Sequence, residues 1–544
     1  MTLQLRPHRL GYWILLFCVG SRLVAGVVSR EEAALFLEQV TWGPTPELID
    51  KVSTEGKAQF LDEQFSAPAT LYPLPGEGDN SMAPYQRLFY QAGAHGPDQL
   101  RQRVSFALGQ ILVVSAATLG RPQQMVPYIN LLQSRAFDNY RDLLLDVSVS
   151  PAMGDYLDNV NNQKPNPAKN TAPNENYARE FLQLFTVGTG LLNEDGSART
   201  DSIGNPLPTY SEDTVKQMAL AITGWVYAPL PGEPLRARNP ANYSAPMVAY
   251  EPSHDQTEKT LLNGYTMPSG RSATEDLEDA VTHVFNHPNT GPFVCVRLIR
   301  SLVTSNPSPA YVARVVSVFN NNGHGVRGDL KAVVRAILMD PDASNPDGAP
   351  GLNWETSGHL KEPVFYVLSV MRAIGATVSD TNNLNRFASN MGQSVYYPSS
   401  VFNYFHLDYE LGDSGLYGPE FEIHTSSSAI QRANFIASVV DRGLGAGVTY
   451  SFDSLAAIAA DPDSLVEELN LRLTHGSLPE TAKEVVKEFV LGTSNAASRV
   501  NRALYLIAVS PYGVVSGERM APRGRRSIGR QRLTRQRPGR SERD

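Results

Sequence analysis

The sequence predicts a mainly α-helical protein: a multi-helix orthogonal bundle of two to three packed subdomains with at most a small β-hairpin. Hydrophobic residues make up 42% and charged residues 19% of the chain, which excludes wholesale disorder, collagen and coiled coil. Apolar residues recur at helical spacing from Ser29 onward. A length of 544 residues also exceeds the roughly 100 to 200 residues of one domain, which predicts several subdomains.

The helical pattern is clearest over residues 100–115. Leu100, Val104, Leu108 and Ile111 fall on one stripe there, as in an amphipathic helix. The same periodicity predicts helices over residues 30–41, 139–149, 174–187, 213–223, 274–286, 292–303, 309–320, 329–339, 360–374, 426–441, 463–474, 479–491 and 495–508.

Strand signals are few and short. We expect residues 225–227 and 247–250 to pair as a small hairpin around a proline-rich insertion. Loop-rich segments are expected over residues 66–83, 159–173 and 188–210. Residues 391–425 are rich in aromatic side chains, so we expect an ordered excursion that packs onto the body.

The N-terminal residues 1–26 have the layout of a signal peptide. A basic start precedes an apolar stretch, and small residues near Ala25 and Gly26 suit cleavage. The apolar stretch is about half the roughly 20 residues that a spanning helix needs. We therefore expect export, to the periplasm, the cell exterior or the envelope, and no transmembrane span in the mature chain. An uncleaved anchor and a buried first helix are the alternatives.

The C-terminal residues 516–544 differ in composition from the body. They hold ten arginines against three acidic residues and almost no apolar side chains, so we expect a disordered tail. A polyanion-binding arm is the alternative. Without both ends, the net charge of −8 becomes −18 for the body over residues 27–515. So acidic a body repels phosphate backbones, and we expect it to bind no nucleic acid.

A first candidate site lies at the start of the helix predicted over residues 174–187. Asn174 is placed to cap the helix, and Glu175 and Arg179 have the favoured i,i+4 pairing, which are ordinary stabilising effects. The density of polar residues after an Asn-rich loop also suits a cleft wall. In that second interpretation Glu175, Arg179 and Glu180 are catalytic, and Asn174 and Asn176 bind the ligand.

A second candidate site is the string from His254 to Lys259. His254 and Asp255 are candidate ligands of a divalent metal or an acid/base pair, with Lys259 as a binding residue. Adjacent side chains of an extended chain point to different sides, however, so a hydrogen-bonded loop staple is the alternative.

Several strings of the chain resemble the bacterial proteins grouped as domain of unknown function 1800 (DUF 1800). These strings are LRQRVSFALGQILVVS (100–115), NENYAREFLQLFTVG (174–188), AITGW (221–225), the His254-Asp255 string, FNHPNTGPF (285–293), LIRSLVTSNPSPAY (298–311), GVRGDLKAVVRAILMD (325–340), KEPV (361–364) and PSSVFNYF (398–405). The resemblance spans roughly residues 30 to 512. It implies an exported, mainly helical protein with no established activity, often encoded beside the DUF 1501 family, which resembles alkaline phosphatases and sulfatases.

Taken together, these features predict an exported binding or accessory partner in a cell-envelope system, with a DUF 1501 protein as a possible partner. Neither a Gly-rich phosphate loop nor a dinucleotide fingerprint occurs in the sequence. The alternative is a metal-assisted or acid/base hydrolase. It would use the Glu175, Arg179 and Glu180 cluster together with His254 and Asp255.

Overall fold

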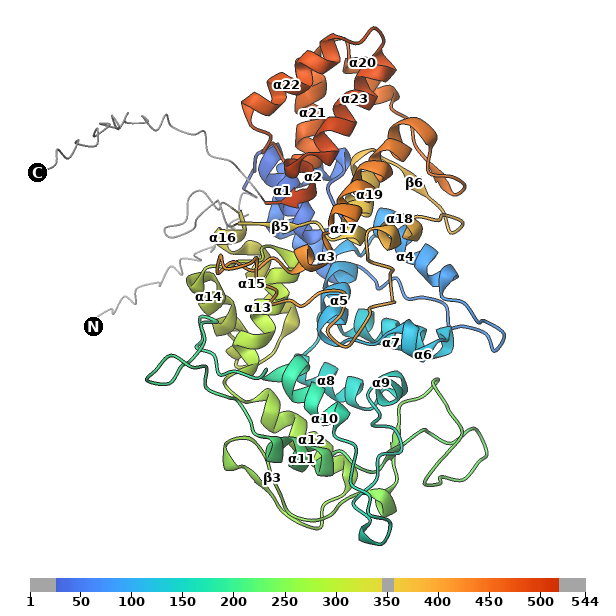
Figure 1. The fold of residues 1–544 in the computed structure, drawn as a ribbon, viewed down its shortest axis with the longest axis vertical. Coiled ribbons are helices and arrows are strands. Elements are labelled where there is room, and N and C mark those ends of the chain that lie inside the picture. Colours follow the sequence, from blue (N-terminus) through green and yellow to red (C-terminus); the bar gives the residue numbers. More distant parts are fainter. Residues whose placement is uncertain (1–25, 345–356, 518–544) are drawn as a thin grey trace, which may run out of the picture.

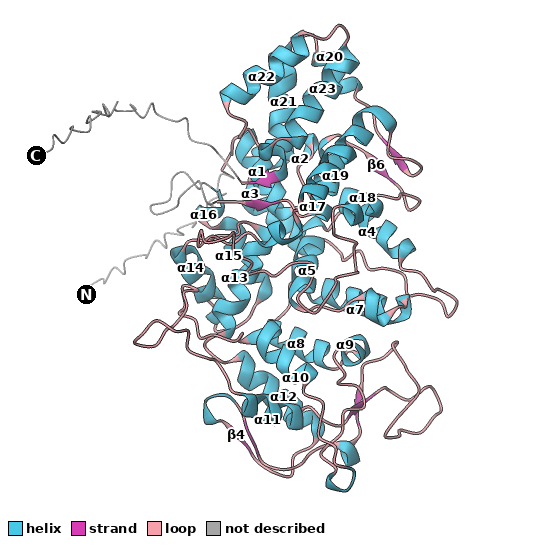
Figure 2. Ribbon diagram, viewed as in Figure 1, coloured by secondary structure: helices cyan, strands magenta, loops and turns pink. Residues whose placement is uncertain are grey.

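The structure is a computed structural model that describes residues 26–344 and 357–517. The predicted signal segment and the arginine-rich tail beyond residue 517 lie outside the described residues. Helices dominate the described chain, which confirms the mainly α prediction (Figures 1 and 2).

The N-terminal third is mainly helical, with an irregular stretch over residues 67–82. Its helices are α1 (Arg30–Val40), α2 (Pro46–Glu55), α3 (Lys57–Ser66), α4 (Ala83–His95), α5 (Gln99–Ile111), α6 (Ala116–Leu119), α7 (Pro122–Arg135), α8 (Tyr140–Ser148) and α9 (Pro151–Tyr156). The helices α2, α3, α4, α6, α7 and α9 were not among the predicted segments. The middle of the chain forms α10 (Asn176–Glu180), α11 (Glu212–Ala221), α12 (Ala273–Phe285), α13 (Thr290–Leu302), α14 (Pro309–Asn320), α15 (Leu330–Met339) and α16 (Pro341–Ser344).

The C-terminal part continues with helices. They are α17 (Pro363–Ala373), α18 (Asn385–Asn390), α19 (Ser426–Ala437), α20 (Asp453–Ile458), α21 (Pro462–Thr474), α22 (Glu480–Leu491), α23 (Ala496–Val509) and α24 (Pro511–Val514). Short 3₁₀ helices are η1 (Pro167–Lys169), η3 (Glu251–Ser253), η4 (Leu262–Gly264) and η6 (Pro419–Ile423), and π-helical turns are η2 (Phe181–Thr186) and η7 (Ser438–Arg442).

The segment predicted as one helix over residues 174–187 is divided in the structure. It begins as α10 and continues as the π-helix η2. The hydroxyl of Thr186 donates to the carbonyl of Phe181, five residues earlier, over 2.6 Å. Such π-helical turns are frequent at functional sites, which draws attention to the side chains that η2 presents.

Four antiparallel pairs of two-residue strands complete the fold. The predicted hairpin is confirmed as β1 (Trp225–Val226) with β2 (Val248–Ala249). Three further strand pairs were not predicted. They are β3 (Lys259–Thr260) with β4 (Thr266–Met267), β5 (His359–Leu360) with β8 (Val515–Ser516), and β6 (Thr377–Val378) with β7 (Val448–Thr449). Ser516 pairs with His359 and is buried, so the packed body extends past the predicted start of the tail.

The helices are stacked along the long axis of the molecule. In Figure 1, α20 to α23 pack together at one end, α10 to α12 lie at the other, and α5 and α13 lie between them. Buried apolar residues from Ala33 to Ala508 form one connected cluster, so these layers share a core. At its centre the fully buried guanidinium of Arg103 lies 5.1 Å from the ring of Trp42 and 4.5 Å from that of Phe365.

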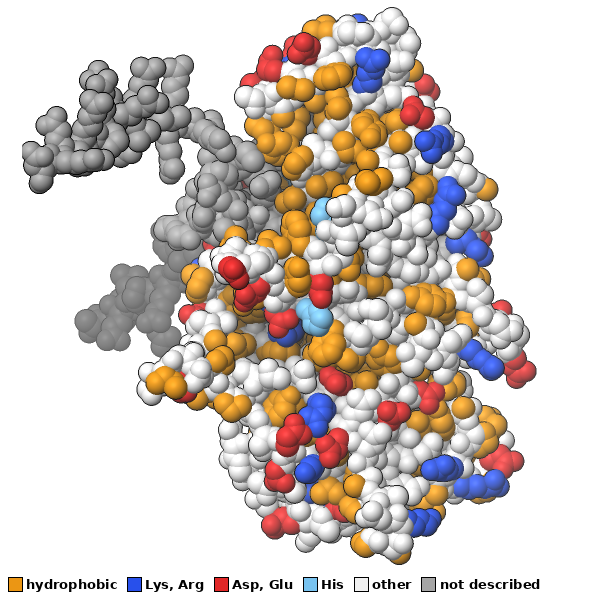
Figure 3. Space-filling model, in the orientation of Figure 1, with side chains coloured by type: hydrophobic (Ala, Val, Ile, Leu, Met, Phe, Trp, Pro, Cys, Tyr) orange, Lys and Arg blue, Asp and Glu red, His pale blue; other side chains and the backbone are white. Residues whose placement is uncertain are grey.

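The surface carries charges of both signs. On the face drawn in Figure 3, acidic and basic side chains are interspersed among apolar ones. Within the described ranges, none of the helices combines the length and apolar character that crossing a bilayer requires.

Candidate functional site

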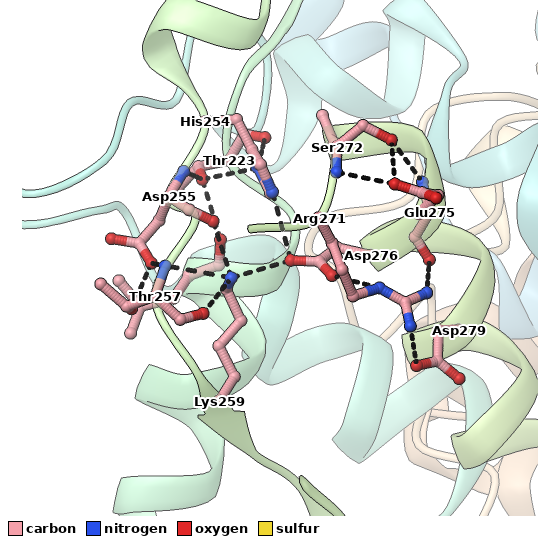
Figure 4. A network of polar contacts seen from close by, with 12 residues as sticks. Thr223, His254, Asp255, Thr257, Lys259, Arg271, Ser272, Glu275, Asp276 and Asp279 are labelled. Atoms are coloured by element: carbon pink, nitrogen blue, oxygen red, sulfur yellow. Dashed lines mark hydrogen bonds and ion pairs between the residues drawn. The ribbon is translucent and has the colours of Figure 1, made fainter. Parts of the chain in front are cut away.

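The predicted His254 cluster is a buried ion network, drawn in Figure 4. Lys259, 1% exposed, donates from Nζ to the carbonyl of Asp255 over 2.6 Å and to Oδ2 of Asp276 over 2.8 Å. Arg271 approaches the other carboxylate oxygen of Asp276 to 3.0 Å. Burial opposes ionisation of Asp276, but hydrogen bonds from His254 and Lys259 outweigh it and lower its pKa.

His254 has both ring nitrogens engaged in this network. Nδ1 lies 2.9 Å from the carbonyl of Thr223, and Nε2 lies 3.2 Å from Oδ2 of Asp276. The Asp255 carboxylate accepts from the backbone N–H of Thr257 over 3.0 Å. The arrangement therefore fastens the loop after η3 to α12, which is the geometry of a loop staple.

The predicted Glu175 cluster lies on the surface. Arg179 forms a two-pronged ion pair with Glu212 of α11, with N–O distances of 2.8 and 2.9 Å, and contacts Glu175 at 3.2 Å. Glu180 differs, because its carboxylate is buried and Oε2 has no hydrogen-bond partner among the residues that the structure describes. Burial raises the pKa of Glu180.

The two asparagines of this cluster form hydrogen bonds at the N-terminus of α10. The side chain of Asn174 accepts from the backbone N–H of Asn176 over 2.8 Å, but the N-cap position of α10 is Glu175, so Asn174 lies one residue before the cap predicted for it. Asn176 in turn donates from its side chain to Asp158 over 3.2 Å. Both asparagines thus have local structural partners.

Helix α11 separates the two predicted clusters. Glu212, the partner of Arg179, is its first residue, and Thr223, the partner of His254, follows its last residue. Ten residues of α-helix span about 15 Å. The structure therefore does not bring the two clusters into one pocket. In the described part of the chain, no three His, Cys, Asp or Glu side chains are grouped as metal ligands would be.

A cleft of about 310 Å³ lies elsewhere, where α5 and α13 pack side by side. Its wall combines the C-terminal end of α5, one face of α13 from Phe293 to Arg300, Gln183 and Leu184 of the π-helix η2, and parts of residues 188–196 and of residues 401–408 in the aromatic excursion. The excursion is ordered and packs onto the body, as predicted. We call this space the Arg297 cleft.

Arg297 of α13 is the most distinctive group of the cleft. Its guanidinium lies 3.4 Å from the centre of the Phe293 ring, and the side chain is half-buried. Burial lowers the pKa of Arg297 to about 10, so it stays protonated at neutral pH. Among described residues no carboxylate lies within 4.0 Å of this guanidinium, so the charge lacks an ion-pair partner.

Arg300, one helical turn further along α13, is held more tightly. It donates from Nε to the carbonyl of Ser305 over 3.1 Å and from Nη1 to that of Leu407 over 2.9 Å. Its guanidinium also lies 3.9 Å from the centre of the Tyr417 ring. Because its partners are carbonyls and a ring, Arg300 adds a second positive charge that no described carboxylate pairs within 4.0 Å.

A buried carboxylate stands behind the cleft. Glu362, at the start of α17, accepts from Gln110 over 2.8 Å and from Gln393 over 2.5 Å. Burial raises its pKa to about 7. Gln110 lines the cleft and also accepts from the hydroxyl of Ser301 over 3.3 Å, so it joins the cleft wall to Glu362.

A family model described as a protein of unknown function (DUF1800) matches residues 35–512. The chain belongs to the DUF1800 family. No curated protein and no solved structure matches it significantly.

Several of the strings that resemble DUF1800 proteins meet at the Arg297 cleft, although Arg297 itself lies between two of them. Gln110, Gln183, Arg300, Glu362 and Phe402 come from five different strings, and each lines the cleft or contacts a residue that does. Sequence reasoning weighed dense local charge instead and therefore missed this site. The available signal was the set of family-like strings itself. These strings are far apart in the sequence, and only the folded chain brings them together.

Proposed function

We propose that this DUF1800 protein is an exported binding protein whose Arg297 cleft takes the anionic group of a small ligand. The shared chemistry of a carboxylate, phosphate or sulfate fits the site. The observation that carries the proposal is Arg297: a charged, half-buried guanidinium that lines an open cavity and has no described carboxylate within 4.0 Å.

The chemistry of the guanidinium supports the binding of an anionic group. Its planar fork of N–H donors matches the two oxygens of a carboxylate or phosphate, and the ring of Phe293 holds its plane. A half-buried charge is less screened by water than an exposed one, so an incoming anion gains more there. Asp408 lines the same cleft beyond 4.0 Å from both arginines, where it suits a hydroxyl or amino group of the ligand.

The experiment is calorimetric titration of the protein with inorganic phosphate, sulfate and acetate. Arg297→Gln is expected to weaken binding at least tenfold, since a hydrogen bond to a charged group is worth about 1.5 to 3 kcal/mol. Arg297→Lys keeps the charge but loses the fork, and we expect an intermediate loss. The matched control is Arg335→Gln, which removes an exposed arginine paired with Asp62 on another helix.

Two outcomes decide the proposal. Binding of at least one anion that Arg297→Gln weakens and Arg335→Gln does not supports it. Absence of binding to all three anions, or equal affinities for both glutamine variants, would overturn it.

Export and partnership rest on the sequence. The signal-like layout of residues 1–26 supports a role outside the cytoplasm, and the family resemblance suggests a DUF 1501 protein as partner. Co-purification of a tagged chain with a DUF 1501 protein encoded beside it tests the partnership. Recovery of the chain alone under mild conditions would count against it. The hydrolase alternative gains no support from His254 and Asp255, because both are engaged in the buried network.

A further inference from the structure

A second, smaller cavity of about 80 Å³ adjoins the Arg297 cleft. It lies between α5, α7 and residues 396–404, and its wall is mostly apolar and aromatic, including Phe106, Ile129, Leu132 and Tyr396. We call it the apolar pocket. Apolar side chains predominate on this wall, so an apolar ligand group gains by entering it, although polar side chains such as Gln133 and Asn403 also line it.

Gln110 lies on the boundary between the two spaces. Its side chain lines both, and it is held in place by Glu362 and Ser301. The excursion crosses the same boundary: Val401 and Phe402 line the cleft, while Asn403 and Tyr404 line the apolar pocket. A ligand that spans this boundary would contact both spaces.

We infer that the ligand is an amphipathic anion, in which a short alkyl group is joined to the anionic group. The inference rests on the proposed anion binding and adds the apolar half of the molecule. The anionic group pairs with Arg297, and the alkyl group fills the apolar pocket.

The size of the apolar pocket limits the alkyl group. Its volume of about 80 Å³ is roughly half that of the 150 Å³ cavity known to hold benzene. A short alkyl chain fits this space, whereas an aromatic ring does not fit without expansion of the wall. Long chains also exceed it, so affinity is expected to stop rising once the pocket is full.

The test is a calorimetric series with inorganic phosphate, methyl, ethyl, butyl, hexyl and phenyl phosphate. Each fully buried methylene is worth about 0.8 kcal/mol, so each tightens binding up to about fourfold. We expect the dissociation constant to fall from methyl to butyl phosphate by at least tenfold. Hexyl and phenyl phosphate are expected to bind no more tightly than butyl phosphate.

Gly109→Ala tests the apolar pocket separately from the Arg297 cleft, because Gly109 lines only the pocket. A Cβ at Gly109 meets Leu132 at 3.5 Å, an ordinary contact, so the added methyl group narrows the pocket without a clash. Alanine also suits the interior of α5 better than glycine, and the melting temperature is expected to stay equal or rise. The variant should bind inorganic phosphate as the natural chain does and lose most of the gain from the butyl group.

The outcomes distinguish this inference from the proposed function. Equal affinities from inorganic to hexyl phosphate, or a butyl gain that Gly109→Ala leaves intact, would overturn the inference while anion binding stands. Failure of every compound to bind would overturn both. The inference is supported if affinity rises with alkyl chain length up to about butyl phosphate and if this rise is lost in Gly109→Ala.

Discussion

Gln110 donates a 2.8 Å hydrogen bond to the buried carboxylate of Glu362, which lies 252 residues further along the chain. This bond joins the wall of the Arg297 cleft to a group whose pKa is raised to about 7 by burial. A carboxyl group that titrates near neutrality makes the stability of the protein depend on pH, because the unfolded chain ionises it at a lower pH.

Glu362→Gln should remove this pH dependence. Between about pH 4.5 and 7 the unfolded state binds fewer protons at this position than the folded state, so the stability of the natural chain falls by about 3 kcal/mol as pH rises. The Glu362→Gln variant does not lose this stability. The difference in unfolding free energy between the variant and the natural chain should therefore shift in favour of the variant from about pH 4.5 to 7 and stay constant above pH 7. Urea unfolding at pH 5, 6, 7 and 8 measures the difference. Parallel stability curves for the two proteins would contradict the assignment.

Asp276→Asn should destabilise the protein by about 3 kcal/mol, because it leaves the buried Lys259 with only the more distant carboxylate of Asp255, 3.6 Å away. The matched control is Asp279→Asn in the next turn of α12, which removes a partly exposed pair with Arg271 and should cost less than about 1 kcal/mol. Chemical denaturation of both variants gives the comparison. Equal, small effects would show that the network does not hold the fold together.

Asp255→Asn distinguishes a structural role of the His254 cluster from metal binding. Since both nitrogens of His254 are hydrogen-bonded, we expect the purified natural chain and the variant to have the same metal content, and the variant to melt at a lower temperature. Elemental analysis and melting curves check this. Stoichiometric metal in the natural chain that disappears in an equally stable variant would establish the site predicted from the sequence.

Gly188→Ala should disturb the Arg297 cleft through Phe293. Gly188 has a φ of +68°, and a Cβ there would overlap the Phe293 ring on which Arg297 is stacked. Gly120→Ala is the matched control, because Gly120 has a φ of +82° and no atom within 4 Å of the added Cβ. Both variants incur backbone strain of about 1 kcal/mol or more, but only Gly188→Ala should also weaken phosphate binding. Equal phosphate affinities in the two variants would argue against the role of Phe293.

Export is expected to leave a mature chain that begins near Val27 or Val28. N-terminal sequencing of the protein recovered outside the cytoplasm measures the cleavage position. A soluble cytoplasmic product that begins at Met1 would contradict the signal-peptide prediction.

The sequence by itself determined most helices and the first hairpin, because these depend on neighbours within one or two turns. The stripe of Leu100, Val104 and Leu108 predicts α5, and Asn174 predicts the start of α10 to within two residues. The helix α7 was missed: Pro127 lies inside it, and its place in the bundle depends on packing against α5. The π-helical turn η2 also follows from tertiary packing rather than from propensity.

Only the tertiary structure decided which polar residues form a site. Dense charge at His254 and Asp255 suggested chemistry, yet packing against α12 buries these residues with partners of their own. Arg297 gave no such signal, since an arginine every few residues of a helix ordinarily faces water. Arg297 becomes a candidate binding residue only when α13, η2 and the aromatic excursion enclose it with no described carboxylate within 4.0 Å of its guanidinium. The burial of Arg297 and its separation by more than 4.0 Å from the carboxylate of Asp408 are properties of the packed chain, and no local stretch of sequence encodes either.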